Sequence, residues 1–170
     1  MLSIYTIFLG YFPDQGTNYT FQSLNCNTKL HIQRMSQFEC ILLVDDDQIA
    51  NYLHKNFLNK IASVSHITTA NNGEQALSHL HNCLQAEHSF PEIIFLDINM
   101  PVCDGFEFVE AFNKFTVPQK SQVDIVVLTS SSNVSDIHRM ENLGIKYYLN
   151  KPLNKESLSD FFNKRSAAMA

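Results

Sequence analysis

Three short apolar runs, each followed directly by polar residues, constrain the fold of this chain more than any other feature. They are CILLV at 40–44, IIFL at 93–96 and IVVL at 125–128. Uninterrupted apolar runs of this length are typical of strands that are buried on both faces of a parallel sheet. Two weaker strands are expected at 64–69, where VSHITT alternates, and at 146–149, where KYYL is short and aromatic. These runs predict a five-stranded sheet.

Segments with helical periodicity separate the expected strands, and they fall at 49–58, 76–84, 105–115, 135–143 and 156–164. In each segment apolar residues recur at the spacing that lines up one helix face, and that face is expected to cover the sheet. In the first helix these residues are Ile49, Leu53, Phe57 and Leu58. Because crossovers are right-handed, the helices should lie on both faces. The pattern predicts an α/β fold of the flavodoxin-like, doubly wound class, with five parallel strands in the order 2-1-3-4-5 and five helices.

A single domain is expected at residues 38–165, a length that suits one hydrophobic core. Residues 1–37 lack a sustained period and contain the turn sequence PDQG, so they are predicted to form an irregular N-terminal extension. Residues 166–170 are predicted to be a short tail. Met35 stands shortly before the first strand, and one hypothesis is that it is the natural start and that the extension is not native. If mass spectrometry shows that the native protein begins near Met1, that hypothesis is contradicted.

The composition excludes several classes of protein. With 45% hydrophobic and 17% charged residues, the chain is typical of a globular domain rather than of a disordered or membrane protein. The apolar opening at 2–12 is too short to span a bilayer and lacks the basic start of a signal peptide, so we expect a cytoplasmic protein without membrane binding. A formal net charge of -5 without basic clusters argues against direct nucleic acid binding. The four cysteines show no C-x-x-C spacing and are expected to be reduced.

Polar residues follow the strands at the points where the strands end, and they are Asp45, Asp46, Asp47, Asp97, Asn99, Thr129 and Lys151. Ligands of open α/β sheets bind outside the carboxyl ends of the strands, so these side chains are expected to share one crevice. Carboxylates gathered there repel one another unless a cation compensates them, and a set of oxygen ligands favours Mg²⁺ or Mn²⁺. A metal beside a further carboxylate, a hydroxyl and an ammonium group suits phosphoryl transfer, with the carboxylate as the nucleophile.

Five motifs at these strand ends together resemble the receiver domains of response regulators from two-component signal transduction systems. They are VDDD at 44–47, LDINMP at 96–101, DG at 104–105, TS at 129–130 and KP at 151–152. Each motif is common by itself, but here all five occur in the order of the family and on the matching strand ends. The resemblance covers about residues 39–165. Because no effector domain follows residue 164 in the sequence, a stand-alone, single-domain receiver is expected.

The resemblance implies a phosphorylation chemistry for the crevice. Asp97 would accept a phosphoryl group from the phosphohistidine of a histidine kinase or a histidine phosphotransfer protein, and the signal would pass to a downstream protein that the sequence does not identify. Such a domain is not an enzyme in the usual sense, because it catalyses only its own phosphorylation and dephosphorylation. The implied residues are Asp97, Thr129 and Lys151 for catalysis; Asp45, Asp46, Asp97 and the Asn99 carbonyl for the metal; and Thr129 and Tyr148 for the switch.

Other interpretations of the same residues stay open. A helix cap explains Asp47 better than a ligand role does, and Asp104 is expected to open the third helix. For Tyr148 the alternative is a packed aromatic residue without a switch role. The alternative function is a non-phosphorylated pseudo-receiver, a protein-binding module, although no residue required for phosphorylation is missing. A phosphohydrolase of the haloacid dehalogenase class is disfavoured, because its D-x-D-x-T motif needs an aspartate where this chain has Asn99.

Overall fold

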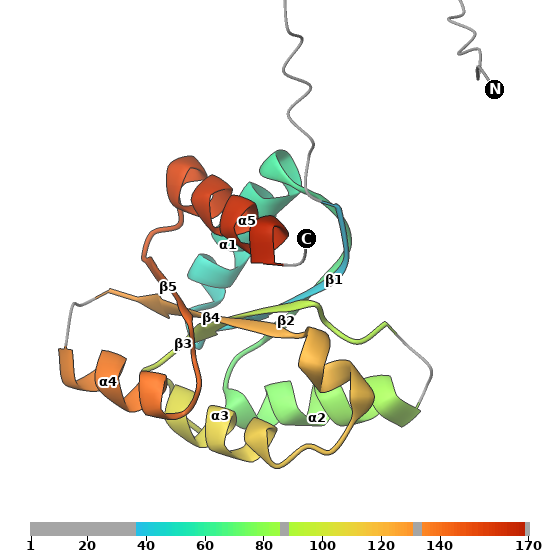
Figure 1. Ribbon diagram of the computed structural model, residues 1–170, viewed down its shortest axis with the longest axis vertical. Coiled ribbons are helices and arrows are strands. Elements are labelled where there is room, and N and C mark those ends of the chain that lie inside the picture. Colours follow the sequence, from blue (N-terminus) through green and yellow to red (C-terminus); the bar gives the residue numbers. More distant parts are fainter. Residues whose placement is uncertain (1–36, 86–88, 131–133, 169–170) are drawn as a thin grey trace, which may run out of the picture. The chain divides into compact units, whose positions relative to one another are not determined.

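A parallel sheet forms the centre of the fold (Figure 1). The computed structural model describes residues 37–85, 89–130 and 134–168, and residues 1–36 of the predicted extension lie outside this part of the chain. The described strands are all parallel and lie in the order β2-β1-β3-β4-β5, which confirms the predicted fold class. They are β1 Gln37–Val44, β2 Ser63–Ala70, β3 Ile93–Asp97, β4 Asp124–Thr129 and β5 Tyr147–Asn150.

Helices connect the strands and lie on both faces of the sheet. They are α1 Gln48–Ile61, α2 Gly73–Gln85, α3 Gly105–Asn113, α4 Val134–Asn142, α5 Lys155–Ala168 and a short 3-10 helix η1 at Pro118–Gln122. Figure 1 shows α1 and α5 on one face and α2, α3 and α4 on the other. The five predicted helices are confirmed, whereas η1 was not predicted and α5 continues beyond its expected end. No helix in the described residues is both long and apolar enough to cross a membrane.

The side chains of the inner strands alternate between two hydrophobic clusters, one under each layer of helices. On β1, Leu42 and Val44 belong to the cluster that includes residues of α2, α3 and α4. Ile41 and Leu43 belong to the cluster that includes residues of α1 and α5. On β3 every residue is buried. A strand that is covered on both faces has no solvent-facing position, and this accounts for the continuous apolar runs in the sequence.

Helix α1 turns a different face to the sheet than the sequence predicted. Leu58 is fully buried, as expected, but Ile49 and Leu53 are 71% and 58% exposed. The buried positions in the first half of the helix are Asn51 and His54. The prediction that Ile49 and Leu53 cover the sheet is therefore wrong. On the face that lies inside, the Asn51 amide hydrogen-bonds to the backbone carbonyls of Asp45 and Ala70.

Side-chain caps determine where two helices begin beside the strand ends. Asp47 is the N-cap of α1, and its carboxylate accepts hydrogen bonds from the backbone N–H groups of Ile49 and Ala50 at 2.8 and 3.2 Å. Asp104 and Glu107 form a capping box at the start of α3. Such caps satisfy N–H groups that have no partner within the helix. The structural roles predicted for Asp47 and Asp104 are therefore confirmed.

Two identical substitutions on α1 test the observed orientation of this helix. Leu58→Ala removes a fully buried side chain and is expected to lower the free energy of unfolding by about 2–5 kcal/mol. Leu53→Ala acts on the exposed face, and its expected effect on the same quantity is below about 1 kcal/mol. Urea unfolding followed by circular dichroism measures both. Equal losses in the two variants would contradict the orientation.

Candidate functional site

Neighbouring strand ends bring the predicted functional side chains to one edge of the sheet. In the register between β3 and β4, Asp97 pairs with Leu128, the residue before Thr129. Strand β4 pairs with β5 through Thr129 and Asn150, and the backbone N–H of Lys151 donates to the Thr129 carbonyl at 2.8 Å. Asp45 follows β1, which lies on the other side of β3. The parallel pairing therefore gathers residues from separate segments into one crevice.

The ammonium group of Lys151 lies between two carboxylates. Its Nζ atom is 2.6 Å from Oδ2 of Asp45 and 3.2 Å from Oδ1 of Asp97. Asp45 and Asp97 are only 2% and 9% exposed, so both ion pairs are largely shielded from water. A buried carboxylate without a partner is strongly unfavourable, and Lys151 compensates part of this charge. The structure thus brings three of the predicted residues together, and it adds a contact between Lys151 and Asp45 that was not predicted.

Asp46 completes an acidic cluster with Asp45 and Asp97. Carboxylate oxygens of the three residues all lie within 4.8 Å of one another. Asp46 is exposed to solvent, whereas the other two are buried. Three carboxylates carry more negative charge than one ammonium group can balance. An oxygen-only donor set that is open to water on one side fits a small divalent cation such as Mg²⁺ or Mn²⁺.

The pKa values of Asp97 and Lys151 are both raised, for different reasons. Burial raises the pKa of Asp97, and the Lys151 ammonium group opposes this rise without cancelling it. Burial by itself would lower the pKa of Lys151, but the hydrogen bond to Asp45 and the charges of both aspartates outweigh it, so the pKa of Lys151 is raised. Lys151 is therefore a firmly charged ammonium group. Asp97 is a buried carboxylate that faces this positive charge at 3.2 Å.

The loop after β3 holds the backbone of Asp97 against helix α3. The N–H group of Gly105 donates to the Ile98 carbonyl at 2.9 Å. A Cβ atom at Gly105 would lie 2.6 Å from the carbonyl oxygen of Asp97, so only glycine allows this close approach. Asn99 is exposed in the same loop. Its role as a metal ligand through its carbonyl stays a prediction.

The predicted switch residues, Thr129 and Tyr148, lie on the neighbouring strands β4 and β5. Thr129 is half-buried at the end of β4. The hydroxyl of the half-buried Tyr148 donates to the carbonyl oxygens of Ile145 at 3.3 Å and Ile137 at 3.5 Å, and Ile137 belongs to α4. Tyr148 therefore contacts the helix that follows the Thr129 strand. The switch itself stays a prediction.

Two buried polar side chains behind the acidic cluster were not predicted. They are Asn51 and His54, on the inner face of α1. The Asn51 Nδ2 group donates to the Asp45 carbonyl at 2.7 Å. Burial lowers the pKa of His54, which favours the neutral imidazole. Their spacing in the sequence could have indicated them, because Asn51 and His54 lie on the same helix face as Leu58. Apolar residues are usual on such a buried face, so polar residues there are unusual.

The cysteines do not offer a competing chemical centre. Those that the structure describes, Cys40, Cys83 and Cys103, are free thiols, as predicted, and Cys26 lies outside the described residues. Burial raises the pKa of Cys40 to about 11. Desolvation also raises the pKa values of Cys83 and Cys103. A protonated thiol is a poor nucleophile and a poor metal ligand, so these residues are best explained as packing side chains.

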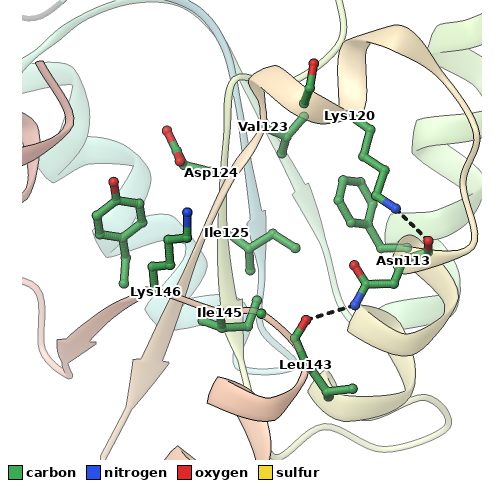
Figure 2. A pocket seen from close by; sticks show the side chains of 12 residues that line it. Asn113, Lys120, Val123, Asp124, Ile125, Leu143, Ile145 and Lys146 are labelled. Atoms are coloured by element: carbon green, nitrogen blue, oxygen red, sulfur yellow. Dashed lines mark hydrogen bonds between the residues drawn. The ribbon is translucent and has the colours of Figure 1, made fainter. Parts of the chain in front are cut away.

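A hollow at the opposite end of β4 and β5 is less suited to chemistry. Figure 2 shows that its polar groups bind one another: the Lys120 ammonium group donates to the Asn113 carbonyl at 2.6 Å, and the Asn113 amide donates to the Leu143 carbonyl at 2.9 Å. Asp124, also in its wall, binds the Arg165 guanidinium at 2.6 Å. These contacts tie helices α3 and α5 to the sheet and its loops. The crevice at the carboxyl ends of the strands therefore remains the candidate site.

Comparison with known proteins identifies the family of the chain. The family model of the response regulator receiver domain matches residues 41–163 of the chain. The probable C4-dicarboxylate response regulator DctR of Bacillus subtilis (strain 168) is 27% identical over 124 residues, which are 73% of this chain and 50% of that protein. The chain thus spans about half the length of such relatives.

Solved structures of response regulators are similar over most of the chain, as two examples show. A two component response regulator from Cytophaga hutchinsonii is 30% identical, with a TM-score of 0.69 over 77% of this chain and 98% of the other. The chemotaxis protein CheY4 of Vibrio cholerae is 28% identical, with a TM-score of 0.58 over 75% of this chain and 98% of the other. Sequence motifs, strand order and these matches agree, and the chain belongs to the response regulator receiver domain family of two-component signalling.

Proposed function

We propose that this chain accepts a phosphoryl group on Asp97 from the phosphohistidine of a histidine kinase or a histidine phosphotransfer protein. The phosphorylated chain then signals to a downstream protein through a change of conformation. The observation that supports this most is the contact of Lys151 with both Asp45 and Asp97 beside the exposed Asp46. It combines a nucleophilic carboxylate, a fixed positive charge and a place for a cation in one crevice.

The acidic cluster would hold the divalent cation through Asp45, Asp46 and Asp97, with the Asn99 carbonyl as a further ligand. Receiver domains typically bind Mg²⁺ at such a cluster. The fit rests on donors that are all oxygen and on the excess of carboxylates over ammonium groups. When bound, the cation supplies positive charge next to the phosphoryl group that is transferred.

The transfer exchanges one bond to phosphorus for another. A carboxylate oxygen of Asp97 forms the new phosphorus–oxygen bond while the phosphorus–nitrogen bond of the phosphohistidine breaks, and the electron pair of that bond returns to the imidazole ring. Lys151 contacts the phosphoryl oxygens through its ammonium group, and Thr129 does so through its hydroxyl. The firm positive charge of Lys151 balances part of the charge of the product.

The phosphoryl group adds a charge of about -1.5 to -2 to the crevice. We expect this charge to draw the Thr129 hydroxyl inward and to shift α4, the helix that follows β4 in the chain. Tyr148 already contacts the backbone of α4 through its hydroxyl. A displacement of α4 therefore alters the surface formed by α4 and β5, and the downstream protein recognises the altered surface.

The phosphoacceptor role predicts a metal-dependent phosphate adduct with acetyl phosphate as the donor. Intact-mass spectrometry should show the adduct on the wild-type chain with Mg²⁺, and removal of Mg²⁺ by a chelator should abolish it. Asp97→Asn should show no adduct, because the amide cannot attack phosphorus. Asp47→Asn is the matched control, because Asp47 caps α1 and asparagine is an equally good cap.

A wild-type chain without any adduct would favour the pseudo-receiver, a module that works through protein contacts alone. An adduct that persists in Asp97→Asn would place the acceptor elsewhere. Loss of the adduct in Asp47→Asn would show that acidic charge in general, rather than Asp97 in particular, controls the reaction.

Lys151→Met should separate metal binding from phosphoryl transfer. The ammonium group competes with a cation for the same carboxylates, so its removal should tighten Mn²⁺ binding, measured from the electron paramagnetic resonance signal of free Mn²⁺. The rate of labelling by acetyl phosphate should nevertheless fall by about 10²-fold, because a charge that stabilises the phosphoryl oxygens is lost. Lys155→Met, at the exposed start of α5, is the control. Weaker Mn²⁺ binding or an unchanged rate in Lys151→Met would contradict these roles.

A further inference from the structure

Asn51 lies on α1 behind the acidic cluster, and we infer that it is a positioning residue for the divalent cation site. The inference rests on the proposed function, because it concerns the site proposed for Mg²⁺ or Mn²⁺. The Asn51 Nδ2 group donates to the carbonyl oxygen of Asp45 at 2.7 Å and to that of Ala70 at 3.5 Å. The residue is only 3% exposed, so water cannot readily replace these hydrogen bonds.

The Asn51 amide acts on the peptide unit that joins Asp45 to Asp46. Because a peptide unit is planar, a hydrogen bond to the Asp45 carbonyl also restricts the Cα atoms of both aspartates. The N–H group of Asp45 donates to the same Ala70 carbonyl at 3.0 Å, which ties this turn to the end of β2. These hydrogen bonds set the directions in which two carboxylates leave the backbone. Asn51 therefore controls two of the three proposed carboxylate ligands without contacting the cation.

Stability alone does not explain an asparagine at this position. Asparagine is a weaker helix former than alanine or leucine. Its Oδ1 atom is buried and lacks a hydrogen-bond partner within the described part of the chain, which is unfavourable. The same helix face buries Leu58, so an apolar side chain would suit position 51. Residues that lower local stability are expected at functional sites. At position 51 the function would be the hydrogen bonds of the amide to the backbone beside the acidic cluster.

The substitution Asn51→Leu removes the donor while nearly keeping the shape of the side chain. Groups that orient metal ligands typically change metal affinity by about 10–100-fold when they are lost, so we expect Mn²⁺ to bind about tenfold more weakly. The melting temperature should stay within about 4 °C of the wild-type value, because the lost hydrogen bond and the removed buried oxygen offset each other. Asn51→Ala repeats the loss of the donor without adding apolar bulk.

The control variant is Asn56→Leu on the same helix. The Asn56 amide donates to the Tyr52 carbonyl at 3.0 Å and stays within α1. It contacts none of the proposed ligands, so its removal should leave Mn²⁺ affinity unchanged. Mn²⁺ affinity is measured on the full chain from the electron paramagnetic resonance signal of the free ion.

A second measurement distinguishes a positioning role from a loss of the nucleophile. In the acetyl phosphate assay, the Mg²⁺ concentration for half-maximal labelling of Asn51→Leu should rise about tenfold, in step with the Mn²⁺ affinity. The rate at saturating Mg²⁺ should stay close to that of the wild type, because Asp97 and Lys151 are untouched.

The outcomes separate this inference from the proposed function. Unchanged Mn²⁺ affinity in Asn51→Leu, with a wild-type chain that binds Mn²⁺, would overturn the inference and leave the proposed function intact. Failure of both Asn51 variants to fold would assign the residue to the fold, and would overturn the inference too. A wild-type chain that binds no Mn²⁺ would overturn the cation site itself.

Discussion

Two buried carboxylates, those of Asp45 and Asp97, share the ammonium group of Lys151 at the carboxyl edge of the sheet. This contact joins the ends of β1 and β3 to the segment after β5, and it depends on the strand order, which places β3 between β1 and β4. Removal of one partner from such a group leaves an uncompensated buried charge, at a cost of about 3–5 kcal/mol. The geometry of the crevice therefore depends on charge balance as well as on packing.

The same charge balance connects the structure to the proposed chemistry. One ammonium group faces three carboxylates, and burial raises the pKa of Asp97 despite the neighbouring Lys151. The carboxylate charge that Lys151 does not balance would attract a divalent cation. A phosphoryl group on Asp97 would bring further negative charge into a crevice that already holds a fixed ammonium group. The two helices that begin beside this crevice are capped by Asp47 and Asp104.

Much of this arrangement follows from the sequence because it depends on neighbours along the chain. The run IIFL predicted a fully buried strand, and β3 is buried at every position. Asp45 and Lys151 each directly follow a strand and Asp97 is the last residue of one, so parallel pairing alone brings them to one edge. The roles of Asp47 and Asp104 as caps were also predictable, because a cap depends on backbone groups within three residues.

The rest could not be predicted because it depends on how separate elements face each other. Along α1, two sets of residues recur at helical spacing, and either set could face the sheet. Only the structure shows that Asn51 and His54 lie inside while Ile49 and Leu53 lie outside. The contact between Lys151 and Asp45 depends on a side chain that reaches across two neighbouring strands. The hydrogen bond from Asn51 to the Asp45 carbonyl depends on the rotation of α1 about its axis. The periodicity of the sequence determines neither the rotation of α1 nor these two side-chain contacts.

Chemical trapping of the acyl phosphate tests whether Asp97 itself carries the phosphoryl group. Borohydride reduces an acyl phosphate of aspartate to homoserine, so the chain would be treated with acetyl phosphate and Mg²⁺, reduced, digested and sequenced by tandem mass spectrometry. If Asp97 is the acceptor, we expect homoserine at position 97 and aspartate at positions 45, 46 and 47. Homoserine at another position, or a phosphate adduct that yields no homoserine, would contradict it.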